Sequence, residues 1–346
     1  MKLASLKHGR DGRLLVVSRD LARAVEATKI APTLQAALDG WATAAPALQA
    51  LSDALNAGTV ESAPFDPSAC AAPLPRAFQW ADGSAYVNHV ELVRRARGAD
   101  IPQRFWHEPL LYQGGSDDLL GPRDDIPLGN EDWGLDFESE LAVITDDVPA
   151  GTSADAAAEH VQLLMLVNDV SLRGLIPGEL EKGFGFFQSK PATAFSPVAI
   201  TPDELGTAWQ DARVCLPLIT HYNRTLFGRP DAGQDMTFSF ADLIAHATRT
   251  RNLGAGTIIG SGTVSNKARG AKTADDDYGA AISEGGTGYS CLAELRMVET
   301  LRTGAPITGF LRAGDHVQID MFDLQGASIF GAIEQRVVPA SGSPAQ

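Results

Sequence analysis

The stretch from Trp133 to Ile144 constrains the fold more than any other part of this chain. Read as a β-strand, it places alternate side chains on one face, so Asp136, Glu138 and Glu140 point the same way. After Glu140 the alternation gives way to the apolar run 141–144, which is typical of a strand covered on both faces. The strand is therefore predicted to enter a buried core at the point where its carboxylates lie.

These carboxylates have two interpretations. Neighbouring acids on one face of a strand lie roughly 7 Å apart, and burial makes their mutual repulsion costly. Protonation relieves the repulsion, and so does a divalent cation, which prefers oxygen ligands. The other interpretation is a solvent-facing edge strand with an acidic stripe. The residues of this stretch alone leave both interpretations open.

Composition excludes several classes of partner and site. The chain has 346 residues, enough for one large domain and a small one, and a net charge of −15. That charge argues against nucleic acids and anionic membranes, which both need basic patches. Three widely spaced cysteines support neither a disulfide framework nor a zinc site. With no export signal or membrane-spanning stretch recognised, the protein is predicted to be cytoplasmic.

A proline-dense connector, residues 64–75, is the best predicted domain boundary. It separates a small N-terminal domain, residues 1–75, from a larger domain, residues 76–339, and residues 340–346 are predicted to form a flexible tail. Periodicity and turn signals predict helices at 33–38, 41–56, 154–167 and 240–248, and strands at 14–18, 214–222, 225–227, 257–259, 292–298 and 317–322. The glycine-rich segment 254–263 lacks the GxGxxG spacing of a dinucleotide loop.

Outside the acidic strand, five side chains are candidates for chemistry. The helix-start signal at Asp82 predicts a helix that places Asp82 and His89 on one side, two turns apart. Asp169 follows an apolar run, Lys190 follows an aromatic segment, and Glu294 lies in the middle of a predicted strand. The simpler interpretations are a helix cap for Asp82, a partly buried histidine bonded to a neighbour, and a snorkelling lysine. The segment 102–127 carries aromatic residues and is predicted to be a binding loop or a lid.

Taken in order, these pieces resemble the fumarylacetoacetate hydrolase family over residues 78–338. The motifs are Asp-x6-His at 82–89, Asp-Phe-Glu-x-Glu at 136–140, Asn-Asp-x-Ser-x-Arg at 168–173, Lys190 before Ser-Pro at 196–197, Gly-Ser-Gly-Thr at 260–263 and the later acid Glu294. The resemblance implies an α+β, β-rich fold, namely a C-terminal mixed β-sandwich roll behind a small N-terminal α/β domain, and a homodimer.

The resemblance also implies the roles of site residues. It implies a metal site for Mg²⁺ or Ca²⁺, with Mn²⁺ as a further possibility, and a water-activating pair beside it. Lys190 is expected to supply positive charge. The family's substrate-holding arginine cannot be aligned without a gap, so Arg94 and Arg97 are both candidates. The implied metal set is Asp82, Glu138, Glu140, Asp169 and Thr193; the implied pair is His89 and Glu294; the implied substrate contacts are Tyr112, Thr263, Ser84 and one of the two arginines.

The activity implied is metal-dependent hydrolysis of a carbon–carbon bond in a β-diketo acid, during degradation of aromatic amino acids or other aromatic compounds. Ser84 and Ile176 replace a tyrosine and a glutamine that contact substrate in family hydrolases, which argues against fumarylacetoacetate itself. The alternatives are an acylpyruvate hydrolase, a 2-oxo acid decarboxylase, isomerase or hydratase, and a non-catalytic Ca²⁺-binding protein.

Overall fold

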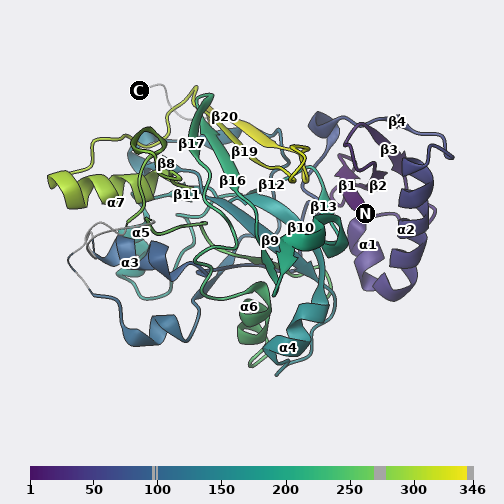
Figure 1. Ribbon diagram of the computed structural model, residues 1–346, viewed down its shortest axis with the longest axis horizontal. Coiled ribbons are helices and arrows are strands. Elements are labelled where there is room, and N and C mark those ends of the chain that lie inside the picture. The colour runs from purple at the N-terminus through teal and green to yellow at the C-terminus, as the bar shows by residue number, and fades with distance from the viewer. Residues whose placement is uncertain (96–97, 99, 269–277, 341–346) are drawn as a thin grey trace.

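The N-terminal part of the chain forms a small antiparallel sheet covered by two helices. In the computed structural model, which describes residues 1–95, 98, 100–268 and 278–340, this part lies at one end of the molecule (Figure 1). Its helices confirm the predicted segments, and Thr33 caps the first by accepting a hydrogen bond from the Ala36 N–H. The elements are β1 (Lys2–Leu6), β2 (Arg13–Val17), β3 (Arg23–Glu26), β4 (Ala63–Pro64), α1 (Leu34–Asp39) and α2 (Trp41–Asn56).

These strands continue into the large sheet of the rest of the chain, because β1 pairs with β13. The sheet order is β4-β3-β2-β1-β13-β10-β9-β18-β5-β6, and β12 pairs with β10. The predicted domain boundary near residue 75 therefore lies between segments that share one sheet, and it remains a prediction. The further strands are β5 (Trp80–Gly83), β6 (Leu111–Gly114), β9 (Ser139–Thr145), β10 (Val161–Asn168), β12 (Ala194–Phe195), β13 (Ala199–Ile200) and β18 (Ile258–Gly260).

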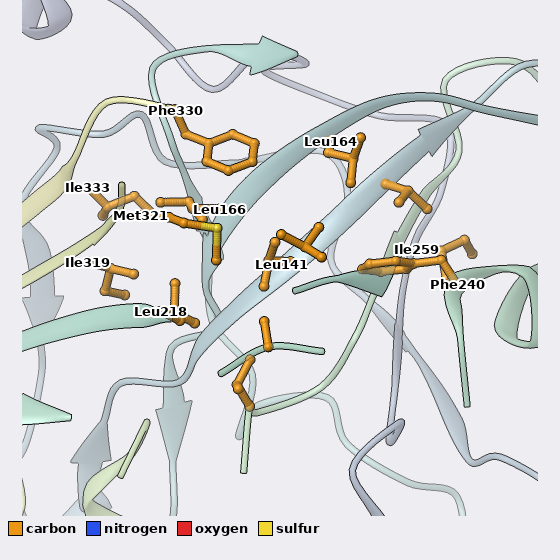
Figure 2. Close-up of a cluster of buried hydrophobic side chains, with 14 of the residues drawn as sticks. Leu141, Leu164, Leu166, Leu218, Phe240, Ile259, Ile319, Met321, Phe330 and Ile333 are labelled. Carbon is orange, nitrogen blue, oxygen red and sulfur yellow. The ribbon is translucent and has the colours of Figure 1, made fainter. Parts of the chain in front are cut away.

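A second, five-stranded sheet packs against the centre of the first. Its order is β17-β16-β19-β20-β7, with β20 and β7 parallel. Figure 2 shows apolar side chains of both sheets meeting in one core, with Leu141 and Leu164 opposite Leu218 and Ile319. The predicted β-rich α+β fold is confirmed. The strands are β7 (Ile126–Leu128), β16 (Leu218–Tyr222), β17 (Thr225–Gly228), β19 (His316–Met321) and β20 (Ile333–Pro339).

The remaining elements are short strand pairs and helices around these sheets. β16 and β17, which correspond to segments predicted as strands, pair as a hairpin in which Asn223 and Arg224 are both at positive φ, 48° and 65°. No helix of the described residues is long and apolar enough to cross a membrane. The elements are β8 (Leu135–Asp136) with β11 (Ser171–Leu172), β14 (Trp209–Gln210) with β15 (Arg213–Val214), α3 (Val87–Arg95), α4 (Ala154–Ala157), α5 (Ile176–Leu180), α6 (Phe240–Ala247) and α7 (Leu292–Thr303).

Three local predictions are wrong. The predicted helix 154–167 stops after one turn, and its apolar part is β10, a central strand buried almost throughout. The predicted strand 292–298 is the first part of α7, whose first backbone N–H groups, at Leu292 and Ala293, donate to Asp136. Asp82 does not cap a helix: it lies in β5, and α3 begins five residues later. In all three cases contacts from distant segments outweigh the local pattern.

The acidic stretch between Trp133 and Ile144 contributes to two strands, β8 and β9, rather than to the single strand predicted. Asp136 ends β8, whereas Glu140 lies in β9, and Glu138 lies between them. All three side chains are buried, so the solvent-facing edge strand is excluded.

Candidate metal centre and active site

Three carboxylates from three separate segments meet in the interior. Asp82 of β5, Glu140 of β9 and Asp169 just after β10 each offer an oxygen, and these oxygens lie within 4.8 Å of one another. β9 is hydrogen-bonded to β10 on one side and to β18 on the other, and β18 pairs in turn with β5. The sheet order therefore places the three acids side by side, although they are far apart in the sequence.

A glycine-rich segment gives Asp82 the room it needs. A Cβ at Gly260 would lie 2.3 Å from Asp82 Oδ1, so a larger residue there would collide with the carboxylate. The same oxygen accepts a hydrogen bond from the Gly262 N–H at 2.9 Å, where Gly262 has a φ of +76°. The glycines of 260–262 thus let the backbone approach a charged side chain closely.

Without a bound cation, burial and mutual repulsion disfavour the charged forms of the three acids. Burial, reinforced by the other carboxylates, raises the pKa of Asp82 and of Glu140 well above their usual range. Burial also raises the pKa of Asp169, although Lys190 opposes the shift. Both oxygens of Glu140 are buried without a hydrogen-bond donor among the described residues. Since buried acceptors are normally satisfied, this cluster fits a divalent cation with hard oxygen ligands.

The other buried glutamate, Glu138, has partners of its own. Its Oε1 accepts from Arg173 at 2.7 Å and its Oε2 from Lys190 at 2.6 Å. Burial alone would raise the pKa of Glu138, but Arg173 and Lys190 outweigh it and hold that pKa below its usual value. Arg173 also donates to Asp136, which anchors the N-terminus of α7. Glu138 therefore connects the acidic cluster to two cations, and its predicted role as a metal ligand remains a prediction.

Lys190 joins this network to Asp169. Its Nζ donates to Asp169 Oδ2 at 2.6 Å and to Ser171 Oγ at 2.8 Å. Burial alone would lower the pKa of Lys190, but the Asp169 and Glu138 carboxylates hold it above its usual value, so the side chain stays charged. Asp169 also accepts from Thr193 Oγ1 at 2.9 Å and from the Tyr112 hydroxyl at 2.6 Å. Thr193 thus orients one of the three acids, and its role as a ligand remains a prediction.

The predicted His89–Glu294 pair is brought together by α3 and α7. His89 Nδ1 lies 3.6 Å from Glu294 Oε1, longer than a hydrogen bond, and accepts or donates no hydrogen bond among the described residues. Ser265 Oγ donates to the same Glu294 oxygen, and Asn88 Nδ2 donates to Ser265 Oγ at 2.7 Å. Ser265 and Asn88 thus hold Glu294 in place, while His89 lines the neighbouring cavity.

A cavity of about 700 Å³ opens beside these groups. Lys190, Glu138 and Asp82 lie on its wall with His89, and the remaining wall is largely apolar. The predicted substrate contacts Ser84, Tyr112, Thr263 and Arg94 line this cavity, as does Ile176. Arg97, the other candidate arginine, lies outside the described residues, as do residues 341–346 of the predicted tail.

Sequence reasoning gave no role to several residues of the site. Arg173 and Ser171 belong to the motif that supplies Asp169, yet their ionic and hydrogen-bonding roles depend on Glu138 and Lys190, which are distant in the sequence. Ser265 carries no pattern of its own, although it follows the Gly-Ser-Gly-Thr motif by two residues. Arg296 lines the cavity and was not singled out; its position one turn beyond Ala293 becomes a signal only once 292–303 is known to be helical.

Residues 79–338 match the model of the fumarylacetoacetate hydrolase C-terminal domain, and residues 1–76 match the model of fumarylacetoacetase N-terminal domain 2. This chain belongs to the fumarylacetoacetate hydrolase family. The match covers most of the chain and includes every residue of the acidic cluster, of the cation network and of the His89–Glu294 pair.

Relatives in the fumarylacetoacetate hydrolase family carry different activities. Over 45% of this chain, the sequence is 30% identical to a 2,4-didehydro-3-deoxy-L-rhamnonate hydrolase of Sphingomonas. Over 54% of this chain, it is 27% identical to an oxaloacetate tautomerase of Bacillus subtilis. These matches span only 53% and 58% of the two relatives. A maleylpyruvate hydrolase of Sphingobium, solved with manganese(II) and pyruvate, shares the fold at a TM-score of 0.62, with 17% identity and coverage of 99% and 100% of the two chains.

Proposed function

We propose that this protein is a metal-dependent hydrolase that cleaves a carbon–carbon bond in a β-diketo acid. The single observation that carries the proposal is the position of His89. It lines the cavity whose wall also includes Asp82 of the buried acidic cluster, and its Nδ1 lies 3.6 Å from Glu294. Asp82, Glu140 and Asp169 would hold the ion, as Mg²⁺, Ca²⁺ or Mn²⁺. The manganese and pyruvate in the Sphingobium maleylpyruvate hydrolase support both the ion and the class of substrate.

The chain's own residues supply the proton transfers and part of the charge. His89 is placed to take a proton from a water molecule, and Glu294 then stabilises the imidazolium, as an acid does in a catalytic triad. The water oxygen bonds to the carbonyl carbon distal to the carboxylate, and the adjacent carbon–carbon bond breaks. Its electron pair leaves as the enolate of a 2-oxo acid, which then takes up a proton. A bound divalent cation supplies positive charge that stabilises such an enolate.

Lys190 contributes a fixed positive charge on the wall of the same cavity. Its ammonium group lies 5.1 Å from the centre of the Tyr112 ring and is held by two carboxylates. Because these partners keep it charged and in place, it needs no reorganisation when negative charge develops on the substrate. Tyr112, Ser84 and Thr263 line the space in which the substrate would lie.

One assay tests this proposal against the alternatives within the family. Purified protein is incubated with acetylpyruvate, larger acylpyruvates, fumarylacetoacetate and oxaloacetate, with Mg²⁺ or Mn²⁺ and separately with a chelator, and the products are identified by NMR. We expect acylpyruvates to give pyruvate and a carboxylic acid, with a rate at least about 100-fold lower in chelator. Conversion of oxaloacetate alone would instead identify a decarboxylase or tautomerase. Metal binding without any turnover would favour the non-catalytic Ca²⁺-binding protein.

A further inference from the structure

Two adjacent helices form the outer wall of the substrate cavity. α3 and α7 pack against each other through an apolar cluster that includes Leu92 and Val298. From α7, the cavity is lined by Ala293, Arg296, Met297 and Thr300, whose i, i+3, i+4 and i+7 spacing is one helix face. The N-terminus of α7 rests on Asp136 beside the acidic site, and Figure 1 shows the helix extending from there to the edge of the molecule. This face therefore leads from the reaction centre outward.

The inner end of the cavity is too negative to attract an anionic substrate. Asp82, Glu138, Glu140 and Asp169 are all buried there, and Asp136 and Glu294 lie next to them. The cations at this end are Arg173 and Lys190, and both are engaged by these carboxylates. Even with a divalent ion bound, the inner end does not carry a clear excess of positive charge. Binding of a further carboxylate, beyond the one next to the metal site, would therefore depend on cations farther out.

Two guanidinium groups meet this need, Arg94 of α3 and Arg296 of α7. Both line the cavity, and neither has a carboxylate within ion-pair distance in the part of the chain that the structure describes. Arg94 lies one and a half turns after His89 and is one of the two arginines, with Arg97, that the family resemblance offers as the substrate-holding residue. Arg296 has no such role assigned to it.

Contacts with Phe310 and Thr308 fix the Arg296 guanidinium in a position suited to binding a planar anion. Its guanidinium lies over the Phe310 ring, 4.1 Å from the ring centre, and its Nη1 donates to the Thr308 carbonyl. A guanidinium has five N–H groups in a rigid fork, so most of them remain for a ligand. The nearest acid on its own helix face, Glu299, is occupied by the N–H groups of Ile307 and Thr308. An arginine fixed by stacking loses little side-chain entropy when it binds a carboxylate.

We propose that Arg296 binds a second carboxylate, at the end of the substrate remote from the acidic cluster, so that the preferred substrate is a dicarboxylate. This inference rests on the proposed function, because it assigns the far end of the same substrate. The cavity suits an apolar or unsaturated chain between the two carboxylates, since Met297, Phe186 and Phe310 are among the residues that line it. The alternative is a structural arginine that only fastens the turn at 306–310 to α7.

The test compares two compounds with the same reacting end. 2,4-Dioxoheptanedioate carries a distal carboxylate, and its 7-methyl ester lacks that charge. Both are assayed with wild type, Arg296→Met, Arg296→Lys and Arg302→Met, in Mg²⁺. Arg302 is the matched control, because it lies on α7 but pairs with Glu284 away from the cavity. Dissociation constants of both compounds are also measured by calorimetry with each variant in a His89→Ala background.

We expect wild type to favour the diacid over the ester by about 10–100-fold in kcat/KM and in Kd, the range of one charged hydrogen-bonded contact. Arg296→Met should remove most of that preference, Arg296→Lys should keep part of it, and Arg302→Met should keep all of it. Equal losses for both compounds, or a wild type without preference, would overturn the inference. If wild type hydrolyses neither compound, the proposed function fails, whereas the ratio of dissociation constants still decides the role of Arg296.

Discussion

Replacing Glu140 by glutamine is expected to weaken Mg²⁺ or Mn²⁺ binding at least about 100-fold and, at the same time, to stabilise the protein in chelator. Glu140 faces Asp82 and Asp169 with no donor among the described residues, so its charge is a cost when no cation compensates it. Without that charge, unfolding in chelator should cost about 1–3 kcal/mol more. Calorimetric titration measures the first effect, and urea unfolding in EDTA measures the second.

Glu138 provides a matched control, for which the change in the free energy of unfolding in chelator is expected to have the opposite sign. It lies two residues away, is also buried, and accepts hydrogen bonds from Arg173 and Lys190. Glu138→Gln leaves both buried cations short of a partner, so the protein in chelator should lose about 3 kcal/mol of stability. If both variants changed the free energy of unfolding in the same direction, the division into one uncompensated and one compensated glutamate would be wrong.

His89→Ala should lower kcat/KM on the true substrate by about 10²–10⁴-fold, the usual contribution of a positioned general base. Metal affinity should not change, because the cluster that would hold the ion consists of Asp82, Glu140 and Asp169 and does not include His89. Glu294→Gln should reduce the rate in the same way, and the double variant should be little worse than His89→Ala alone, since the two side chains act as a unit. Steady-state kinetics on purified variants gives all three values.

His160→Ala is the control for His89→Ala. His160 also pairs with an acid, Asp146, at 2.6 Å, but it lies outside the cavity lining. Its removal should leave kcat/KM within about twofold of wild type. Near-full activity of His89→Ala, or independent and additive losses from His89 and Glu294, would remove the proposed pair from the mechanism.

The sequence predicted those parts of the fold whose signals are local. Helix α1 has its cap at Thr33, and the hairpin of β16 and β17 has two residues that tolerate positive φ. The run 161–167 was misread, because a continuous apolar segment without periodicity fits a buried helix as well as a central strand. For 292–298 the deciding contact is the Asp136 carboxylate at the helix N-terminus, 156 residues away, which no local pattern contains.

The site was predicted through a resemblance of ordered motifs rather than through geometry. The alternating acids around Glu138 and Glu140 suggested a cation, but only the sheet order shows that Glu140 faces Asp82 and Asp169 while Glu138 faces Lys190. Spacing along the chain carries no information on such pairings when the partners lie on different strands. Arg296 was missed for the same reason, since its place on the cavity wall depends on α7 being a helix.

Crystals soaked in Mn²⁺ test the central claim most directly, because manganese is located by its anomalous scattering. We expect one strong peak within coordination distance of carboxylate oxygens of Asp82, Glu140 and Asp169, absent from crystals of Glu140→Gln under the same conditions. A manganese peak away from these three residues, or no peak at millimolar Mn²⁺, would contradict a metal centre built from these acids.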